Sequence, residues 1–412
     1  MNTKYTGRER WILASLALAF FIAASNVMIM SSLIKFMQRE LGFSKLWYGV
    51  LMASTPVAAF VVNLLVGPYL EKYGKSRSMQ YGALGTLVVF TATALAPNFP
   101  LLLGLRVLVS FFSPILSAAV LPLAMEIFAP EKRSQVTGQI MSGAYMAQVL
   151  SIPLGILAGG YISWRWAFGF FALLSGMLFF LSRAYLPRKN EERGTHSITW
   201  KTHRGIWKNI AENKTLLRAL GVFIALIFGI GVFSGLYTVW LFESFRGTEY
   251  ITLKIAGLFL LGGAGASFGS FYSARLTFGV KNLLNYLAIL SFISIPLVLL
   301  ISPMRDYLVL QYLLYLAVMV LGGVRNPLFQ SYILGELCLQ RLRGSLMGVM
   351  NALFAAGIGL GYLLSSFLHL NDSSFALNAL VAALIHLCCG LYLKFGLQDK
   401  GVPKPRLDFE EN

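Results

Sequence analysis

The sequence predicts an all-α membrane protein whose twelve transmembrane helices form two pseudo-symmetric bundles of six. The first observation is composition: 57% of the 412 residues are hydrophobic and only 12% are charged, which is too little polar surface for a water-soluble chain. The second is that the apolar residues gather in runs of about 20, the length that crosses a bilayer as a helix. The third is an internal repeat between the two halves of the chain.

The apolar runs are continuous rather than alternating, which favours helices over the strands of a membrane barrel. The first run is too long for a signal peptide and has no small-residue cleavage site, so we expect it to be the first helix. We expect spans at residues 11–34, 46–70, 79–97, 101–128, 136–162, 165–186, 216–242, 252–274, 283–302, 307–335, 345–369 and 374–396.

The positive charge is placed as in a membrane protein. The chain carries 34 Lys and Arg against 17 Asp and Glu, but most of the basic residues fall in the loops and tails on the side that holds both termini. This bias predicts that both termini are cytoplasmic, in a bacterial-type inner membrane. It argues against nucleic acid as the partner of the basic residues.

The long polar stretch 187–214 separates six expected spans from six. We therefore divide the chain into an N-terminal bundle (1–186), a cytoplasmic linker (187–214), a C-terminal bundle (215–398) and a cytoplasmic tail (399–412). The halves repeat a pattern at the end of their fourth span: an acid, a base seven residues later and a glycine five further on. It occurs as Glu126, Arg133 and Gly138, and again as Glu336, Arg343 and Gly348. Such duplicated halves are typical of secondary transporters.

The loop between spans 2 and 3 reads Gly67-Pro-Tyr-Leu-Glu71-Lys72-Tyr-Gly74-Lys75-Ser-Arg77. It resembles the signature loop of the major facilitator superfamily, and the resemblance extends over nearly the whole chain. Gly67 allows close helix approach and Gly74 a tight turn. The resemblance implies that Glu71 meets the start of span 11, and that Glu126 partners a loop arginine. The gating residues it implies are Gly67, Glu71, Gly74, Lys75, Arg77, Glu126, Arg133, Glu336 and Arg343.

Span 5 contains Pro153, Gly155, Gly159 and Gly160. This resembles the helix-5 signature of the drug and proton antiporters in the same family, although Ile152 stands where that signature has a glycine. Proline and glycine predict a bendable, closely packed helix. We therefore assign Pro153 and Gly155 to gating as well.

Span 4 carries Arg106, followed by Ser110, Ser113 and Ser117 on the same helix face. A charged stripe in an apolar helix is expected to face the bundle interior or a water-filled cavity. The resemblance to the antiporters links this arginine to proton handling. The alternatives are snorkelling and helix–helix bonding.

Arg325 lies about 11 residues before the end of span 10, so roughly 16 Å from the cytoplasmic edge, near the bilayer centre. Asn326 and Gln330 follow it. An arginine at this depth predicts a binding site, the alternative being a structural role in capping carbonyls that Pro327 frees.

Further residues expected to line the cavity are polar or aromatic. For two of them, Tyr237 and Trp240, an interfacial aromatic belt is the alternative. No acid lies deep in any expected span, so the cavity should prefer anionic, zwitterionic or neutral solutes over cations. The substrate-binding set is Asn26, Arg106, Ser110, Ser113, Tyr145, Gln148, Tyr237, Trp240, Arg325, Asn326, Gln330 and Asn351.

The resemblance implies a secondary transporter that works by alternating access, and first a proton-coupled exporter. The alternative is an uptake symporter or exchanger for an anionic or zwitterionic metabolite bound by Arg106 and Arg325. No motif for an enzyme, a nucleotide or a metal is found, so we expect no cofactor and an ion gradient, that of H⁺, as the energy source. The expected partners are a small-molecule substrate and membrane lipid, with the chain acting as a monomer.

Overall fold

The computed structural model describes residues 5–129, 132–187, 212–276, 279–337, 343–371 and 374–397. Within these ranges the chain forms helices and no strand. The helices of the first half are α1 (Gly7–Leu41), α2 (Trp47–Tyr73), α3 (Lys75–Ala94), α4 (Phe99–Ile127), α5 (Arg133–Tyr161) and α6 (Trp164–Tyr185). Those of the second half are α8 (Lys214–Ser234), α9 (Tyr237–Ser244), α10 (Ile251–Ser273), α11 (Val280–Ile301), α12 (Leu308–Gly335), α13 (Arg343–Asn371), α14 (Ala376–Leu391) and the π-helical turn η3 (Tyr392–Gly396).

Eleven described spans are long and apolar enough to cross a membrane, α8 and α9 together forming one of them. The expected third span corresponds to α3, which falls outside this set. Lys75 and Arg77 lie in its first turn and Gln80 follows, so its apolar run is short. It nevertheless packs along α4 and α6 as a member of the first bundle. The predicted linker and tail lie mostly outside the described residues.

The two halves repeat one packing pattern. In the first half α1 packs on α5 and α6, α4 on α2 and α3, and α3 on α6. In the second half α8 packs on α13 and α14, α12 on α10 and α11, and α11 on α14. Each packed pair in the second half corresponds to a packed pair in the first half, because each span of the first half has its counterpart six spans later in the chain. The contacts therefore confirm the predicted all-α membrane fold, with its internal repeat.

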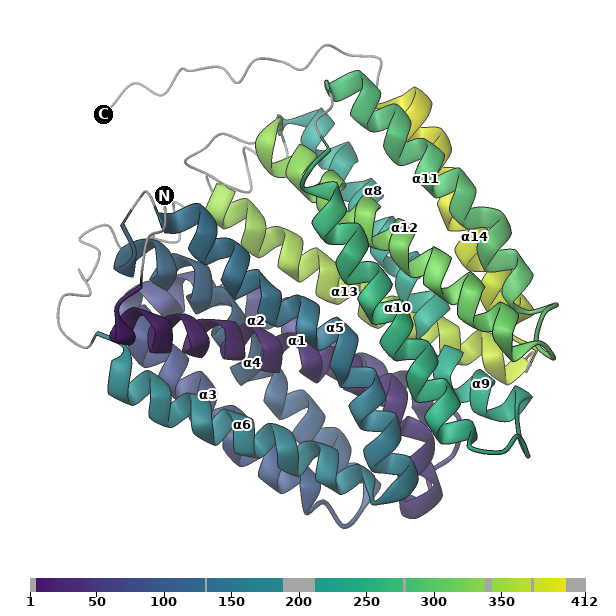
Figure 1. Cartoon of the computed structure of the whole chain (residues 1–412), viewed down its shortest axis with the longest axis horizontal. Coiled ribbons are helices and arrows are strands. Elements are labelled where there is room, and N and C mark those ends of the chain that lie inside the picture. The colour runs from purple at the N-terminus through teal and green to yellow at the C-terminus, as the bar shows by residue number, and fades with distance from the viewer. Residues whose placement is uncertain are drawn as a thin grey trace.

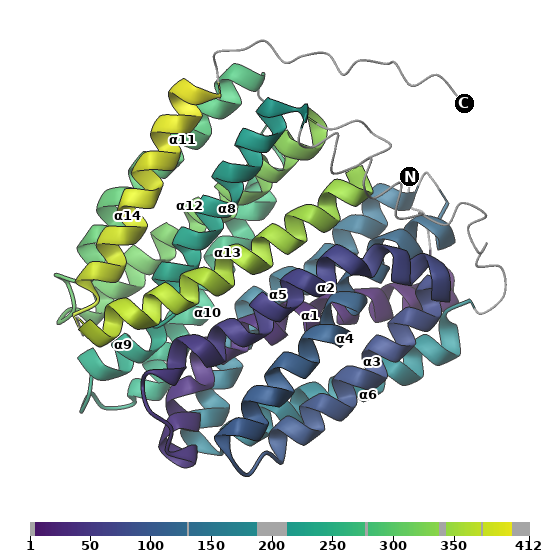
Figure 2. The ribbon, with the colours of Figure 1, turned by 180° about the vertical axis from the view of Figure 1, so that it is seen from behind.

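The halves meet along two helix pairs, α2 with α13 and α5 with α10. We call the end of the bundle where α1 begins the terminal face, and the opposite end, where α1 ends, the distal face. In Figure 1 the first half is purple to teal and the second is green to yellow, and the halves diverge toward the terminal face. They converge near α9 at the distal face, and the reverse view in Figure 2 shows the same arrangement.

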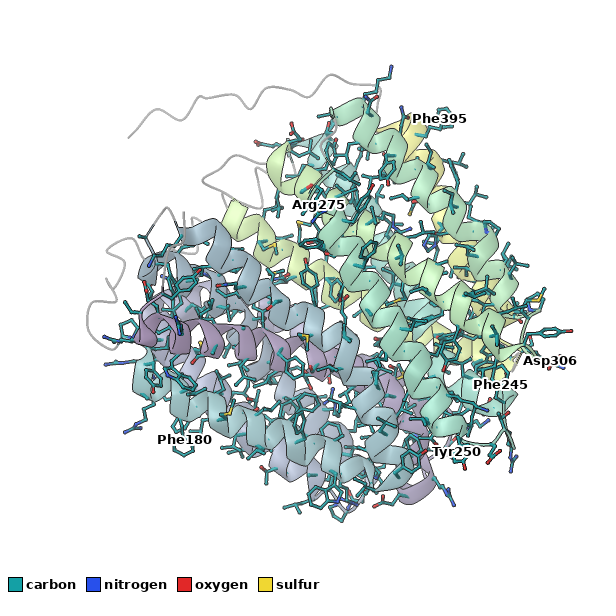
Figure 3. All side chains as sticks on the ribbon, in the orientation of Figure 1. Phe180, Phe245, Tyr250, Arg275, Asp306 and Phe395 are labelled. Carbon is teal, nitrogen blue, oxygen red and sulfur yellow. The ribbon has the colours of Figure 1, made fainter. Side chains whose placement is uncertain are left out.

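The outer surface of the bundle is apolar. Phe180 on α6 and Phe395 in η3 point away from the bundle at its edges (Figure 3), and each is more than 60% exposed. Large exposed apolar side chains continue over α3, α10 and α14. A surface of this kind is stable only in lipid or detergent, which agrees with the long apolar helices.

The seventh span is not the continuous helix that the sequence predicts. It breaks between α8 and α9 at Gly235 and Leu236. A Cβ on Gly235 would lie 2.8 Å from the side chain of Ser365 on α13, so only glycine allows this approach. The main-chain N–H of Leu236 is directed to the Ser365 hydroxyl at 3.3 Å. Glycine's low helix propensity and this competing hydrogen bond explain the break, which sets α9 against α1.

Close approach between the halves depends on glycine. A Cβ on Gly263 of α10 would lie 2.4 Å from the main-chain oxygen of Gln148 on α5, and one on Gly160 would lie 2.4 Å from Thr252. On the other seam, a Cβ on Gly49 of α2 would lie 2.7 Å from Ser366 of α13. Small residues let helix backbones pack tightly in lipid, so these positions determine how closely the halves fit.

We expect Gly263→Ala to lower the free energy of unfolding by about 1–3 kcal/mol, the usual cost of overpacking, because the added methyl group meets the α5 backbone. The measurement is thermal unfolding of the purified protein in detergent. Gly221→Ala on α8 is the matched control: nothing lies within 4 Å of its Cβ position, so the change should be neutral or stabilising by up to about 1 kcal/mol. Equal destabilisation by both variants would contradict the tight seam.

Candidate functional site

A hydrogen bond joins the halves on the α5–α10 seam. The Ser270 hydroxyl of α10 donates to the hydroxyl oxygen of Tyr145 on α5 at 2.8 Å. Gln148, one turn toward the distal face, is half-buried where Gly263 approaches its main chain. Two predicted substrate-binding residues, Tyr145 and Gln148, therefore lie at the boundary between the halves.

The predicted flexible part of α5 packs on α1. Pro153 lies inside the helix, and a Cβ on Gly155 would lie 2.1 Å from the Ser32 hydroxyl of α1. Gly159 approaches the Phe36 ring in the same way. These glycines hold α5 to its own half, whereas Gly160 faces α10 of the other half.

A charged cluster joins the halves at the distal face, and we call it the distal clamp (Lys45, Glu243 and His369). The ammonium group of Lys45, in the α1–α2 loop, donates to Glu243 at the end of α9 at 2.9 Å. The Nε2 of His369 on α13 lies 3.2 Å from the other carboxylate oxygen. Beside the clamp, the rings of Phe36 on α1 and Phe242 on α9 meet edge to face at 5.6 Å.

More positive charge surrounds the same carboxylate. Lys35 lies over the Phe242 ring at 5.1 Å and within electrostatic reach of Glu243 and Arg246. Two lysines of the first half, Lys35 and Lys45, therefore act on Glu243 of the second half. An ion pair in a partly buried setting is stronger than one in water, so the clamp favours contact between the halves at this face.

Ion pairs at the terminal face stay within the first half. Lys75 at the start of α3 pairs with Glu126 at the end of α4, and Lys132 pairs with Glu9 at 3.1 Å. Among the described residues no salt bridge joins the halves at this face. The resemblance implied a loop arginine as the partner of Glu126, whereas the structure pairs it with Lys75.

The other predicted gating residues are only partly described. Gly74 has φ +82°, as expected for the tight turn between α2 and α3. Arg77 and Glu336 are exposed. The remaining gating predictions fall on positions whose side chains lie outside the described part: Gly67, Glu71, Arg133 and Arg343.

Arg106 is wholly buried inside the first half. Its guanidinium donates to the side-chain oxygen of Asn26 on α1 at 2.8 Å and to the main-chain oxygen of the same residue at 2.9 Å. Its central carbon lies 5.7 Å from the ring centre of Phe168 on α6. In this conformation Arg106 and Asn26 bond α4 to α1, which is the helix–helix alternative to an open cavity position.

The serines next to Arg106 extend the same bonding. The Ser110 hydroxyl donates to the main-chain oxygen of Thr55 on α2 at 2.9 Å, and the Thr55 hydroxyl donates to that of Arg106 at 3.1 Å. Ser113 is buried one turn further. The predicted polar stripe of α4 therefore faces the interior of the first half, where it joins α1, α2 and α4.

Arg325 is buried inside the second half, 2% exposed. Two of its nitrogens, Nε and Nη1, have no hydrogen-bond acceptor among the described residues. The structure therefore does not show these atoms capping the carbonyls near Pro327. Its charge acts on His386 and Cys389 of α14. The described carboxylates form no salt bridge with Arg325 or Arg106.

Three other predicted residues of the second half are half-buried: Asn326 and Gln330 on α12 and Asn351 on α13. Asn326 and Gln330 are four residues apart, so they share one face of α12 with Gly322. Arg325 lies on the neighbouring, buried face with Phe329. α12 thus presents a neutral polar face beside a buried cation.

Tyr237 and Trp240 lie in an aromatic core, not in a belt at the membrane surface. Both are buried, and their rings stack at 5.8 Å. The Tyr237 hydroxyl donates to the side-chain oxygen of Gln311 on α12 at 3.1 Å, and Phe375 stacks on Trp240 at 5.1 Å. This core connects α9 to α12 and α14 near the distal face.

Sequence reasoning missed the distal clamp. Lys45, Glu243 and His369 lie far apart in the chain and at helix ends, where charge is ordinary. Gln311 and Ser270 were missed because a single polar residue in an apolar helix has many possible partners. The signal that could have identified the clamp is Glu243 itself, an acid at a helix end on the side with few charges.

The described residues include no group of three His, Cys, Asp or Glu placed to hold a metal. Cys389 is buried and Cys388 exposed on α14, while Cys338 lies outside the described part.

Comparison with known proteins agrees with this arrangement. A model of the Major Facilitator Superfamily matches residues 16–362. Among curated relatives, a D-xylose transporter of Levilactobacillus brevis is 23% identical over 37% of this chain and 33% of its own length. A chloramphenicol resistance protein of Streptomyces lividans is 25% identical over 37% of this chain and 39% of its own. Both matches span less than half of the relative.

The fold is similar to that of a solved human transporter. The crystal structure of the human organic anion transporter MFSD10 (TETRAN) superimposes with a TM-score of 0.71 and 15% sequence identity. The match covers 94% of this chain and 100% of the transporter's chain. At that identity the match shows the fold alone. Together with the family match over most of the sequence, it places the chain in the Major Facilitator Superfamily, a family of membrane transporters and not of enzymes.

Proposed function

We propose that the protein moves a small solute across the cytoplasmic membrane by alternating access, as a proton-coupled exporter. The observation that carries the proposal is that the halves are joined by charge and aromatic contact at the distal face and diverge toward the terminal face. If the terminal face is cytoplasmic, as the basic loops favour, this is the inward-facing state. Rocking of the halves about the α2–α13 and α5–α10 seams would then expose a central site to either side.

Export is supported by the antiporter-like helix 5 and by the chloramphenicol resistance protein among the relatives. Glu243 is the acid of the distal clamp, and opening of the clamp would separate it from Lys45 and His369 and leave it free to take up a proton. Protonation would remove its charge and with it the attraction to Lys45. In this proposal a single chain is the working unit, held in the membrane by its apolar surface.

A second candidate function is favoured by one observation, the unpartnered guanidinium of Arg325. A buried cation suits an anionic solute, and a proton-linked symporter or exchanger for an anionic metabolite would use it. Arg106 fits this role less well in the present conformation, because Asn26 already accepts two of its hydrogen bonds.

The direction of coupled proton flow separates the two candidates. We would reconstitute the protein in liposomes containing a pH-sensitive dye and add chloramphenicol, D-xylose or gluconate outside. Antiport makes the lumen more alkaline as solute enters and protons leave, whereas symport makes it more acidic. Protein-free liposomes are the control. Proton-independent facilitated uptake of a solute would contradict both couplings while leaving transport itself intact.

Locking the distal face should stop the cycle. In a background with the native cysteines replaced, Phe36→Cys with Phe242→Cys places one thiol on each half where the two rings lie 5.6 Å apart. Oxidation traps the pair as a disulfide when the two Cβ atoms come within about 4 Å of each other. We expect oxidation to abolish solute flux and reductant to restore it.

The matched control for this disulfide is Trp11→Cys with Tyr185→Cys, whose rings are also 5.6 Å apart but belong to the first half alone. Oxidation of this pair should leave flux unchanged. Undiminished flux through the oxidised Phe36–Phe242 pair would show that the distal face need not open.

A further inference from the structure

The two buried arginines differ in how their charge is satisfied. Arg106 donates two hydrogen bonds to Asn26 and lies against the Phe168 ring. Arg325 is equally enclosed, yet Nε and Nη1 have no acceptor among the described residues. The second half therefore contains a cation whose hydrogen-bonding capacity is left open.

Such a cation is costly in the middle of a membrane. An ionised group that is buried without a partner loses its hydration and gains nothing in return. Ionisable residues at this depth normally pair with another group or face a pathway. No described carboxylate pairs with Arg325, and of the partners that could satisfy it from outside the described residues, an anion matches its charge best.

Two titratable groups within electrostatic reach of Arg325 lie on α14. The Nδ1 of His386 is 2.7 Å from the main-chain oxygen of Ala382, and because a carbonyl can only accept, Nδ1 must carry the hydrogen. Nε2 is then the atom that can take a second proton. Cys389 is within electrostatic reach of the same guanidinium, and both side chains are at most 6% exposed.

Other charges are remote from His386. Where α8 and α11 pack on α14 the neighbours are apolar, since Gly229 contacts Ile385 and Phe292 contacts Gly390. Arg325 is the charged group that acts on the imidazole. The other described titratable groups on packed elements are Lys214 and Arg218 in the first turns of α8, Lys281 and Tyr286 on α11, Tyr362 and His369 on α13, Cys388 on α14, and Tyr392 and Lys394 in η3.

We propose that Arg325 binds the carboxylate of a small organic monoanion inside the second half, and that His386 takes up a proton when this anion binds. The proposal rests on the second candidate function above and names its substrate class. A guanidinium matches a carboxylate in shape and charge. A single cation suits a single negative charge, so a phosphate dianion should bind less well.

The proton follows from the charge balance. With the site empty, the charge of Arg325 opposes a second positive charge on His386. A bound carboxylate cancels that opposition, so anion and proton favour each other's binding, and the coupling is reciprocal. Carboxylate affinity should therefore rise as the pH falls.

The test is thermal stabilisation of the purified full-length protein in detergent by acetate, gluconate or phosphate, against chloride at equal ionic strength. At pH 8, where phosphate is mainly a dianion, we expect acetate or gluconate to stabilise the protein more than phosphate does. Both carboxylates should bind with at least a few-fold higher affinity at pH 5.5 than at pH 8. Arg325→Gln should weaken carboxylate binding by about tenfold or more, and Arg325→Lys by less, because it keeps the charge but not the planar fork. Arg305→Gln is the matched control, since Arg305 lies in an exposed loop.

The proton is tested separately by His386→Asn, whose amide can still donate to the Ala382 oxygen. This variant should keep carboxylate binding at pH 8 and lose the gain at pH 5.5. If Arg325→Gln fails to fold, Arg325→Lys and His386→Asn still test the site. Full carboxylate binding in Arg325→Gln, stronger stabilisation by phosphate than by carboxylates, or an unchanged pH dependence in His386→Asn would overturn the proposal.

Binding in detergent does not require transport, so the two proposals fail separately. Carboxylate binding without any flux in liposomes would contradict the proposed function and support the site. Flux of a solute without carboxylate-dependent stabilisation would contradict the site and support the proposed function.

Discussion

The bilayer core offers no hydrogen-bond partner to a polar group, and the rest of the structure depends on this constraint. Polar atoms buried in either half therefore need a partner within the protein or on a bound solute. Arg106, Asn26 and Ser110 meet this need in the first half by bonding three helices together. Tyr237 and Gln311 do so in the second. Each half is thereby a unit held by bonds that cannot be exchanged for water, and the seams between the units are left as the places where the molecule can move.

The two faces of these seams differ in their charge contacts. At the terminal face Glu126 pairs with Lys75 within the first half, whereas at the distal face Glu243 pairs with Lys45 across the halves. Glycines such as Gly263 and Gly160 allow α5 and α10 to pack closely. A tightly packed seam and a charge pair that can be released are compatible with two alternative packings of the same rigid halves, because packed interfaces tend to switch between discrete arrangements.

Much of this fold could be predicted from the sequence, because apolar length and charge placement respond directly to the membrane. The turn at Gly74 and the burial of Arg106 and Arg325 follow from single-residue chemistry. The break at Gly235 could not be foreseen, since glycine is also common within membrane helices and the cause is Ser365, distant in the chain. The partner of Arg106 was equally hidden: Asn26 was singled out as a polar residue, but its pairing depends on how α1 crosses α4. The α3 helix shows the opposite limit, where Lys75 and Arg77 shorten an apolar run that packing nevertheless keeps in the bundle.

The central claim is that the halves move as rigid bodies about their seams, and distances between spin labels test it most directly. One label pair joins the halves at the distal face, at Leu95 and Tyr307, both more than 60% exposed. A second joins them at the terminal face, at the exposed Arg77 and Arg275. Leu95 with Arg77, near opposite ends of α3, is the control within one half. When a transported solute or a change of pH shifts the conformation, the account predicts that the distal distance lengthens, the terminal distance shortens and the control stays constant. Distances that change in the same direction at both faces, or a control distance that changes as much as the others, would contradict it.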